Sequence, residues 1–237
     1  MKVAYSKNKI ESLADRFGSR FKLGDKPAVE LMPIGIPEVD KLSGGIPRGA
    51  ITELLGPASS GRTTLLLSAL SAATANEEVC ALIDTNDSFD ATSAAAARVA
   101  FDQLLWIRCG SNVDHAIQAT DLLLQSSGFG LVALDLGDVD PRQSRRVPLS
   151  WWFRFRRAIE NTPTSLLVIS RDPNARSCAS LVFELRRDNV DWSRSELPGA
   201  PIPTCANLLE GFRLHIERRK PVSLDTREAR FQARSLA

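Results

Sequence analysis

A nine-residue segment between two apolar runs limits the fold of this chain more than any other feature. It reads Gly56-Pro57-Ala58-Ser59-Ser60-Gly61-Arg62-Thr63-Thr64 and fits the pattern G-x-x-x-x-G-K-[ST], except that arginine stands at the lysine position. The apolar, β-branched run at 50–55 predicts a buried strand before it, and 64–73 is rich in helix formers. Strand, glycine turn and helix in this order predict a phosphate-binding loop. The alternative is an ordinary Gly/Ser turn.

The residue types in the loop suit a phosphate. Gly56 and Gly61 let the backbone curl so that successive amides face an anion, and the following helix adds its positive N-terminal end. Thr63 stands where a hydroxyl would bind Mg²⁺. Arg62 keeps the positive charge, but its planar fork directs its donors differently from a compact ammonium group. We expect binding of ATP or ADP with Mg²⁺, and slow hydrolysis at most. The predicted binding residues are Gly56, Pro57, Ser59, Ser60, Gly61, Arg62, Thr63 and Thr64.

Composition narrows the class of protein. The 237 residues allow one substantial domain with a full core, and the net charge of +2 requires any nucleic-acid contact to come from a local patch. No apolar run has the length of a membrane span, and the polar start is not a signal peptide, so we expect a cytoplasmic location. Four scattered cysteines and two histidines favour reduced thiols in or near the core over a metal site.

Alternating apolar runs predict an α/β fold. Beyond the loop, buried strands are expected at 78–84, 104–108, 130–135 and 165–170, with a helix over 112–126. This order implies a mostly parallel sheet with helices on both faces. Three later runs alternate apolar and polar residues and predict an antiparallel edge to the sheet, namely 181–186, 212–217 and 229–233.

The first residues are expected to form an arm. Apolar residues at helical spacing over 8–18 predict an amphipathic helix, which a Pro/Gly-bearing segment separates from the core. The arm either packs on its own domain or docks on a neighbour. The predicted organisation is an N-terminal helical arm at 1–27 and a core at 28–237, with no separate C-terminal domain. Residues 198–203 are expected to form a linker-like loop.

The motifs resemble the RecA recombinase core over roughly 28–233. GGIPRGAITELLGPASSGRTTLLLSAL resembles its opening, and VCALIDTNDSFD, LVALDL, SLLVIS and the late strand pair continue the likeness. The resemblance implies a RecA-like three-layer α/β/α fold. It also makes Asp135 the carboxylate that holds the Mg²⁺ shell, although a strand-end acid that caps a following turn would look the same.

Several positions depart from the RecA pattern. The glutamate that activates water in RecA-like ATPases is Asn86 here, and an amide orients water but cannot accept its proton. Asp87 would restore a carboxylate if the alignment slips by one residue. No phosphate-sensing glutamine follows Ser170, because Arg171 stands there. Both regions that bind DNA in RecA are short, and we expect no counterpart of the separate C-terminal domain of RecA.

A shortened RecA core with changed catalytic residues resembles the ImuA family of accessory proteins in damage-induced translesion synthesis. The run 140–146, leading into a helix at about 149–160, is similar to that family. Many ImuA proteins have lost the phosphate loop that this chain keeps. The likeness implies RecA, a translesion polymerase or its ImuB-like subunit as partners in the SOS response to DNA damage.

Basic and aromatic residues cluster around that helix. Arg142, Arg145 and Arg146 are the candidates for contact with single-stranded DNA or a partner. The aromatic residues at 151–155 would suit base stacking, but Trp152 and Phe155 share a helical face with Ile159, as in a helix that covers a sheet. A second basic region in the tail has a solvated strand edge as its alternative.

The sequence therefore predicts a RecA-like nucleotide-binding accessory protein in DNA repair, with weak or absent ATP hydrolysis. The first alternative is an active DNA-dependent ATPase of the recombinase type that binds single-stranded DNA. It would need Arg62 to replace lysine and Asp87 or another acid to serve as base. The second alternative is a structural protein whose loop is a relic. A small-molecule kinase is disfavoured, since no lid or acceptor motif is visible.

Overall fold

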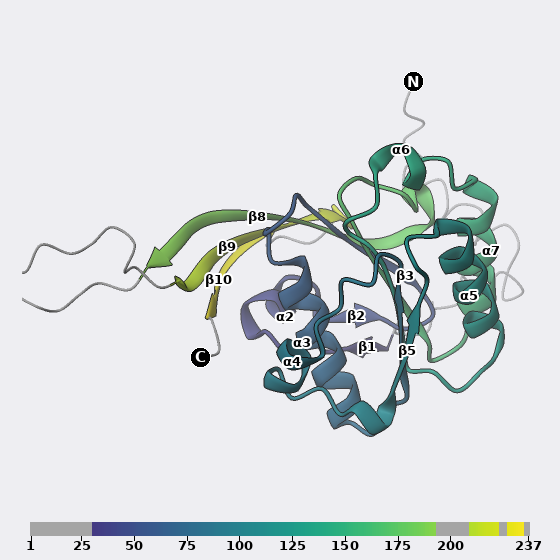
Figure 1. Ribbon diagram of the computed structural model, residues 1–237, viewed down its shortest axis with the longest axis horizontal. Coiled ribbons are helices and arrows are strands. Elements are labelled where there is room, and N and C mark those ends of the chain that lie inside the picture. The colour runs from purple at the N-terminus through teal and green to yellow at the C-terminus, as the bar shows by residue number, and fades with distance from the viewer. Residues whose placement is uncertain (1–29, 193–208, 223–226, 235–237) are drawn as a thin grey trace, which may run out of the picture.

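An eight-stranded sheet forms the centre of the protein, in a computed structural model that describes residues 30–192, 209–222 and 227–234. The strand order is β10-β9-β8-β3-β7-β6-β4-β5. Figure 1 shows the strands β8, β9 and β10 side by side. The strands are β3 (Ile51–Leu55), β4 (Cys80–Asp84), β5 (Leu104–Arg108), β6 (Leu131–Leu136), β7 (Ser165–Ser170), β8 (Ala179–Trp192), β9 (Leu209–Lys220) and β10 (Glu228–Arg234). A separate pair, β1 (Leu31–Met32) and β2 (Ile46–Pro47), is antiparallel.

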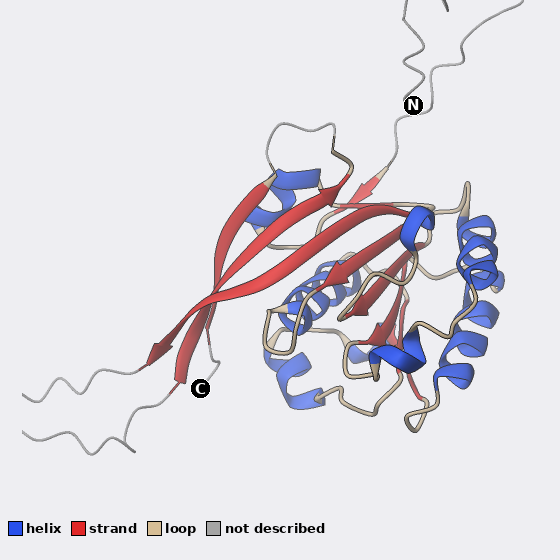
Figure 2. Cartoon of the chain, turned by 90° about the horizontal axis from the view of Figure 1, so that it is seen from above, coloured by secondary structure: helices blue, strands red, loops and turns tan. Residues whose placement is uncertain are grey.

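The helices lie on both faces of this sheet. The helices are α2 (Pro37–Ser43), α3 (Arg62–Ala75), α4 (Ala91–Ala96), α5 (Val113–Gln125), α6 (Pro141–Ser144) and α7 (Leu149–Ile159), with 3-10 turns at Phe101–Gln103 and Arg176–Cys178. Figure 2 shows α5 and α7 on one side of the strands, and α2 and α3 on the other. The three-layer RecA-like α/β fold predicted from the sequence is confirmed.

Two hydrophobic clusters bind these layers together. Leu65 and Leu66 of α3 pack on one sheet face, while Trp152 and Phe155 of α7 pack on the other. Neighbouring strand residues point to opposite faces, so β3 contributes Leu54 to the first cluster and Ile51 to the second. Burial of each such side chain contributes about 1.5–3 kcal/mol. Core packing of Trp152 and Phe155, the alternative to base stacking, is therefore what these two side chains do.

The edge strands differ from the expectation in two ways. The run at 104–108 was expected to be buried, but β5 is the outer strand of the sheet, with Leu105 and Trp106 exposed by 45% and 38%. The run at 181–186 was assigned to an antiparallel edge, but β8 pairs parallel with β3 on one side and antiparallel with β9 on the other. β8 is also 14 residues long and, with β9 and β10, extends beyond the helical layers (Figures 1 and 2).

Parts of the predicted organisation lie outside the described residues. These are the N-terminal arm at 1–27, its helix and the linker-like loop at 198–203. Cys80, Cys109 and Cys178 are free thiols buried in the core, as expected. In the described ranges, no helix combines the length and apolar character that crossing a membrane requires.

Candidate functional site

The predicted phosphate loop lies at the carboxyl end of β3, where α3 begins. Gly56 has φ +155°, and a Cβ there would be 2.5 Å from the Leu185 carbonyl oxygen and 2.6 Å from Ser60 Oγ. Gly61 has φ +94°, and its Cβ would be 2.4 Å from Leu214 Cδ1. Gly56 therefore requires glycine for conformation and for space, whereas Gly61 requires it for conformation, since the Leu214 side chain can shift. The loop is shaped from outside by β8 and β9, which supply the two leucines.

Polar groups of this loop are ready for an anion. Ser60 Oγ is buried, and it makes no hydrogen bond within the described structure. Gly61 is the N-cap of the 14-residue helix α3 and provides no side-chain cap, so the first N–H groups of the helix and the positive end of its dipole face the loop. Pro57, Ser59 and Thr63 are exposed. An unpaired buried hydroxyl beside uncapped amides fits a phosphate group.

A groove of about 880 Å³ continues from the loop. Thr63, Thr64, Leu67 and Ser68 of α3 form one wall. The other walls come from α4 and β10 and include Thr92, Ser93, Gln232 and Ala233. Its volume is within the usual range of small-molecule sites. The sequence did not predict this groove, because the residues that line it come from distant segments. The small side chains of α4 were the available indication that space is left next to this helix.

Arg62 turns away from the loop surface. It is only 7% exposed, and its Nη1 donates a hydrogen bond of 3.2 Å to the carbonyl oxygen of Gly137. Burial lowers the pKa of Arg62, while the nearby carboxylates of Asp135 and Asp138 raise it. The guanidinium therefore sits between the phosphate loop and the segment that follows β6.

Asp135 lies near the end of β6, beside this arginine. Its Oδ1 accepts a 2.8 Å hydrogen bond from the Gly137 amide, so it does cap the following turn. Burial raises the pKa of Asp135 to about 6, although the Gly137 amide and Arg62 lower it.

Asp135 and Thr63 are the two residues expected to bind Mg²⁺. No group of three or more His, Cys, Asp or Glu side chains that could hold a metal ion occurs in the described ranges. Mg²⁺ beside a nucleotide needs fewer protein ligands, since phosphate oxygens and waters supply the rest. No described residue donates a hydrogen bond to Asp135 Oδ2, and the Thr63 side chain is exposed. One carboxylate oxygen and one hydroxyl are thus available, which fits a nucleotide-bound Mg²⁺.

In the loop after β4, the side chains of Asn86 and Asp87 contact different segments of the protein. The buried Asp84 carboxylate fixes this loop by accepting hydrogen bonds from the amides of Ser88 and Phe89, at 2.9 and 3.0 Å. Asn86 Nδ2 then donates to the carbonyl oxygen of Asp138 at 3.2 Å. Asp87 is directed to the β5 side, where it pairs with Arg108 at 3.2 Å and accepts from the Gly110 amide at 3.4 Å. Of the two candidates, Asn86 is the one in contact with the segment after β6.

A buried acid that sequence reasoning missed holds the loop after β7. Glu53, in the middle of β3, is 1% exposed, and its Oε1 accepts hydrogen bonds of 2.8 Å from the amides of Asn174 and Ala175. Burial raises the pKa of Glu53, although these two amides lower it. Arg171, at the position of the missing glutamine, is exposed. The one indication of this role in the sequence is that Glu53 is an acid inside the otherwise uncharged strand ITELL.

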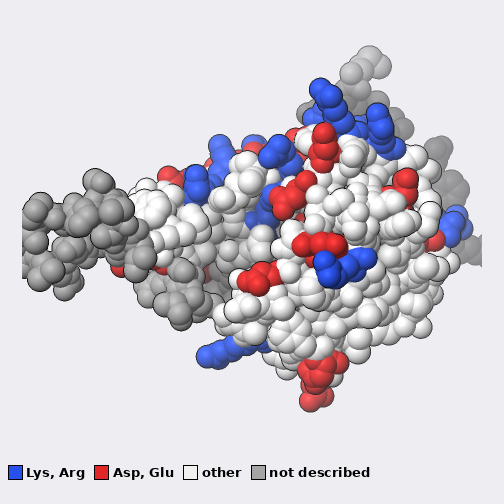
Figure 3. Space-filling model, in the orientation of Figure 1, with Lys and Arg blue, Asp and Glu red and all other residues white. Residues whose placement is uncertain are grey.

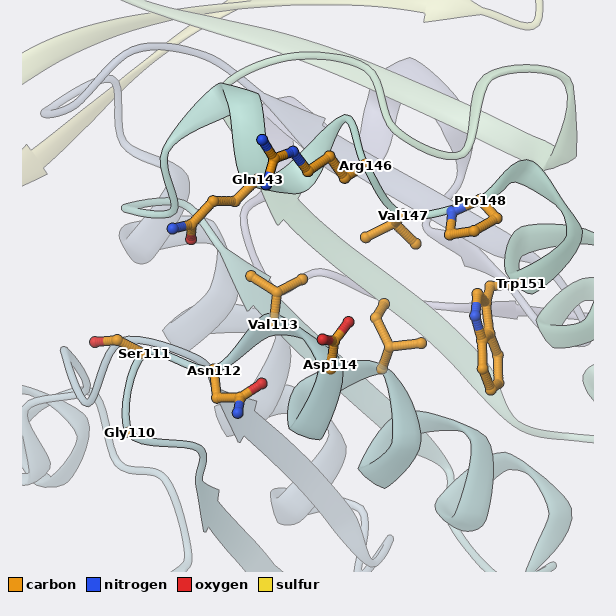
Figure 4. Close-up of a pocket in the computed structure, with 11 residues that line it drawn as sticks. Gly110, Ser111, Asn112, Val113, Asp114, Gln143, Arg146, Val147, Pro148 and Trp151 are labelled. Atoms are coloured by element: carbon orange, nitrogen blue, oxygen red, sulfur yellow. The ribbon is translucent and has the colours of Figure 1, made fainter.

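The three candidate arginines lie on and just after α6, and all are exposed. Figure 3 shows Lys and Arg side chains gathered over α6, at the top of the molecule. Arg145 pairs with Asp172 at 2.9 Å. Arg146 lines a pocket of about 480 Å³ with Gln143, Asp114 and Trp151 (Figure 4). Trp151 is therefore the aromatic residue of α7 that shares a pocket with a candidate arginine.

Comparisons with known proteins agree with this architecture. The model of the RecA N-terminal domain matches residues 5–142 of this chain. RecA of Borrelia turicatae is 35% identical over 123 residues, which are 50% of this chain and 34% of that protein. RecA of Bacteroides thetaiotaomicron is 36% identical over 132 residues, 53% and 40% of the two chains. RecA of Chlorobaculum tepidum is 35% identical over 133 residues, 53% and 38%. The matched segment thus spans a third to two fifths of these relatives.

Proposed function

The chain belongs to the RecA N-terminal domain family, and from that premise we propose that it is a nucleotide-binding accessory protein of DNA repair with weak or absent ATP hydrolysis. The observation that carries the proposal is the phosphate loop itself. Its glycine-dependent curl, its unpaired Ser60 hydroxyl and the uncapped start of α3 adjoin a groove of about 880 Å³. ATP or ADP is the ligand that such a loop and groove would hold together.

The residues of the site then have separable tasks. The amides at the start of α3 would hold the phosphates, and the α4 hydroxyls of Thr92 and Ser93 line the groove for the nucleoside. Thr63 and Asp135 would hold Mg²⁺, which neutralises phosphate charge when bound. Asn86 can orient a water molecule but cannot take its proton, and this is the reason to expect slow hydrolysis.

The proposed setting is damage-induced translesion synthesis in the cytoplasm, as in the ImuA family. The exposed arginines Arg142, Arg145 and Arg146 support contact with a partner or with single-stranded DNA. The proposed protein partners are RecA, a translesion polymerase or its ImuB-like subunit, and a second copy through the N-terminal arm.

An active DNA-dependent ATPase is the second candidate. The retained phosphate loop and the similarity to RecA proteins favour it. It requires a general base, and the nearest alternative acid, Asp87, is engaged by Arg108 and Gly110. Loss of the base makes this candidate the less favoured one.

One pair of measurements separates the candidates. Binding of fluorescent ATP and ADP analogues and release of phosphate would be measured with and without single-stranded DNA. Thr63→Ala should weaken binding about tenfold with Mg²⁺ and little with EDTA, because it removes a metal ligand. Ser180→Ala, which removes an exposed hydroxyl on β8, is the matched control. Strong DNA-stimulated hydrolysis by the wild type would favour the active ATPase, and absence of nucleotide binding would leave a relic loop.

A further inference from the structure

The two changed catalytic positions contact the same short segment. Arg62 Nη1 donates to the carbonyl oxygen of Gly137, and Asn86 Nδ2 donates to the carbonyl oxygen of Asp138, both at 3.2 Å. One donor is the first residue of α3, the other lies in the loop after β4, and the acceptors follow β6. A glutamate at position 86 would have no N–H to donate. The substitutions therefore hold residues 137–138 from two sides.

Gly137 is fitted closely between its neighbours. Its amide donates to Asp135 Oδ1 at 2.8 Å. A Cβ at Gly137 would be 2.9 Å from that oxygen and 3.2 Å from Arg62 Nη1. Arg62 thus positions Gly137. Any residue larger than glycine at position 137 would force Asp135 or Arg62 to shift.

The held segment leads directly to the exposed arginines. The Val139 side chain is buried, and Asp140 caps α6 by accepting from the Arg142 amide at 2.7 Å. α6 begins at Pro141, four residues after Gly137, and Arg145 then pairs with Asp172. With so short a connection, the position of Gly137 determines where α6 and its arginines lie.

A bound phosphate would compete for Arg62. In the described structure Arg62 donates to a neutral carbonyl, while the carboxylates of Asp135 and Asp138 act on it through their charge without a direct ion pair. The bond from Arg62 to Gly137 already has a charged donor. A phosphate would add a charged acceptor, and the attraction between two opposite charges is stronger than that between a charge and a neutral carbonyl. Arg62 is also the first residue of α3, next to the amides that would hold that phosphate.

We propose that Arg62 is a positioning residue with two partners: it holds Gly137 when the phosphate loop is empty and turns to the phosphate when a nucleotide binds. Gly137 then keeps only its bond to Asp135, and the segment 137–146 loosens. Occupancy of the phosphate loop is thereby passed to α6 and its arginines. This inference rests on the proposed nucleotide binding.

Hydrogen–deuterium exchange of the full chain tests the proposal, with binding measured in parallel by a fluorescent ATP analogue. In the wild type, saturating MgATP should speed exchange of amides in 137–146 about tenfold, as expected when a hydrogen bond to a charged donor is lost. Arg62→Met should show the faster exchange already without nucleotide and no further change with it. Arg157→Met removes an exposed arginine of α7 and should behave as the wild type.

A second variant guards against misfolding of the first. Asn86→Asp loses the donor to Asp138, so exchange in 137–146 should be faster in the empty protein and should still respond to MgATP. Binding without any change in exchange, or with slower exchange, would overturn the proposal, as would a full response in Arg62→Met. If the analogue does not bind the wild type, the proposed function fails. The holding role of Arg62 is then decided by Arg62→Met alone, and unchanged exchange in that variant removes it.

Discussion

The phosphate loop and the segments that face it differ in how closely their residues match the RecA pattern. The loop keeps its glycine conformations, its uncapped helix start and its open groove. The facing segments, at the ends of β4 and β7, carry Asn86 and Arg171 where the RecA pattern has a base and a phosphate sensor. Anion binding by backbone amides survives many side-chain changes, whereas proton transfer depends on one side chain. Binding and hydrolysis can therefore be lost separately.

The largest effect is expected from filling the loop at Gly56. Gly56→Ala would place a Cβ 2.5 Å from the Leu185 carbonyl oxygen, at φ +155°. The strain should lower the free energy of unfolding by about 3 kcal/mol. Nucleotide affinity should fall about a hundredfold, in line with a similar loss of binding free energy. Urea unfolding and titration with a fluorescent nucleotide measure the two effects.

Gly110→Ala is the control, because it also has positive φ, at +59°, but nothing lies within 4 Å of its Cβ. It should cost about 1 kcal/mol in stability and leave binding unchanged. Equal losses in the two variants would show that the loop needs only glycine's conformation and not its space.

The next largest effect comes from restoring the facing segment. Arg62→Lys combined with Asn86→Glu supplies an ammonium and a general base, and should raise the rate of phosphate release about a hundredfold. Arg62→Lys with Asn86→Gln has the same side-chain length without a base and should stay slow. Phosphate release with single-stranded DNA and Mg²⁺ is the measurement. If the wild type releases phosphate as fast as the Arg62→Lys, Asn86→Glu variant, the proposed difference between the phosphate loop and the facing segments is wrong.

A smaller effect concerns Asp135 and pH. Its pKa in the folded protein is about 6, raised by burial, against about 3.9 in an unfolded chain. Folding therefore favours the protonated acid. This contribution is present below about pH 4 and is lost as the pH rises through about 6. Over this window the empty wild type should lose about 3 kcal/mol from this group.

Asp135→Asn isolates that contribution. The variant should match the wild type at pH 4 and be more stable at pH 7, as urea unfolding at the two pH values would show. Asp102→Asn, a change at an exposed carboxyl, should give no such difference. A variant less stable than the wild type at pH 7 would mean that the ionised Asp135 is better solvated than its burial implies.

The smallest effect is expected at the surface. Arg145→Gln breaks the pair with Asp172, whose side chains are 63% and 33% exposed, and should change stability by less than about 0.5 kcal/mol. If the arginines contact DNA, the same change should reduce the salt dependence of binding by about one unit of slope. Arg157→Gln on α7 is the control. A salt slope equal to that of the wild type would remove Arg145 from the DNA contact.

Sequence patterns predicted what depends on local order. The strands at 130–135 and 165–170 agree with β6 and β7 within one residue, because each contains an unbroken stretch of four apolar residues, LVAL and LLVI. The run at 104–108 is equally apolar, and only the strand order shows that it is the sheet edge. Position in a sheet is a property of the whole chain, and a run of hydrophobic residues does not contain it.

The site divides in the same way. The loop from Gly56 to Thr64 and the acid Asp135 follow from motif and resemblance. The contacts of Arg62 with Gly137 and of Glu53 with Asn174 join residues 75 and 121 positions apart, and no local pattern contains them. Only the three-dimensional structure shows these long-range contacts.

The position of β3 in the sheet determines when the phosphate loop can form during synthesis of the chain. Its two partner strands pair Ile51 with Leu166 and Thr52 with Leu181, and Gly61 rests against Leu214. The phosphate loop at 56–64 therefore takes its shape from strands that lie more than 100 residues later in the sequence. The ribosome must synthesise the chain through β9 before this loop has its neighbouring strands, so a nascent chain that stops before β9 is not expected to bind nucleotide.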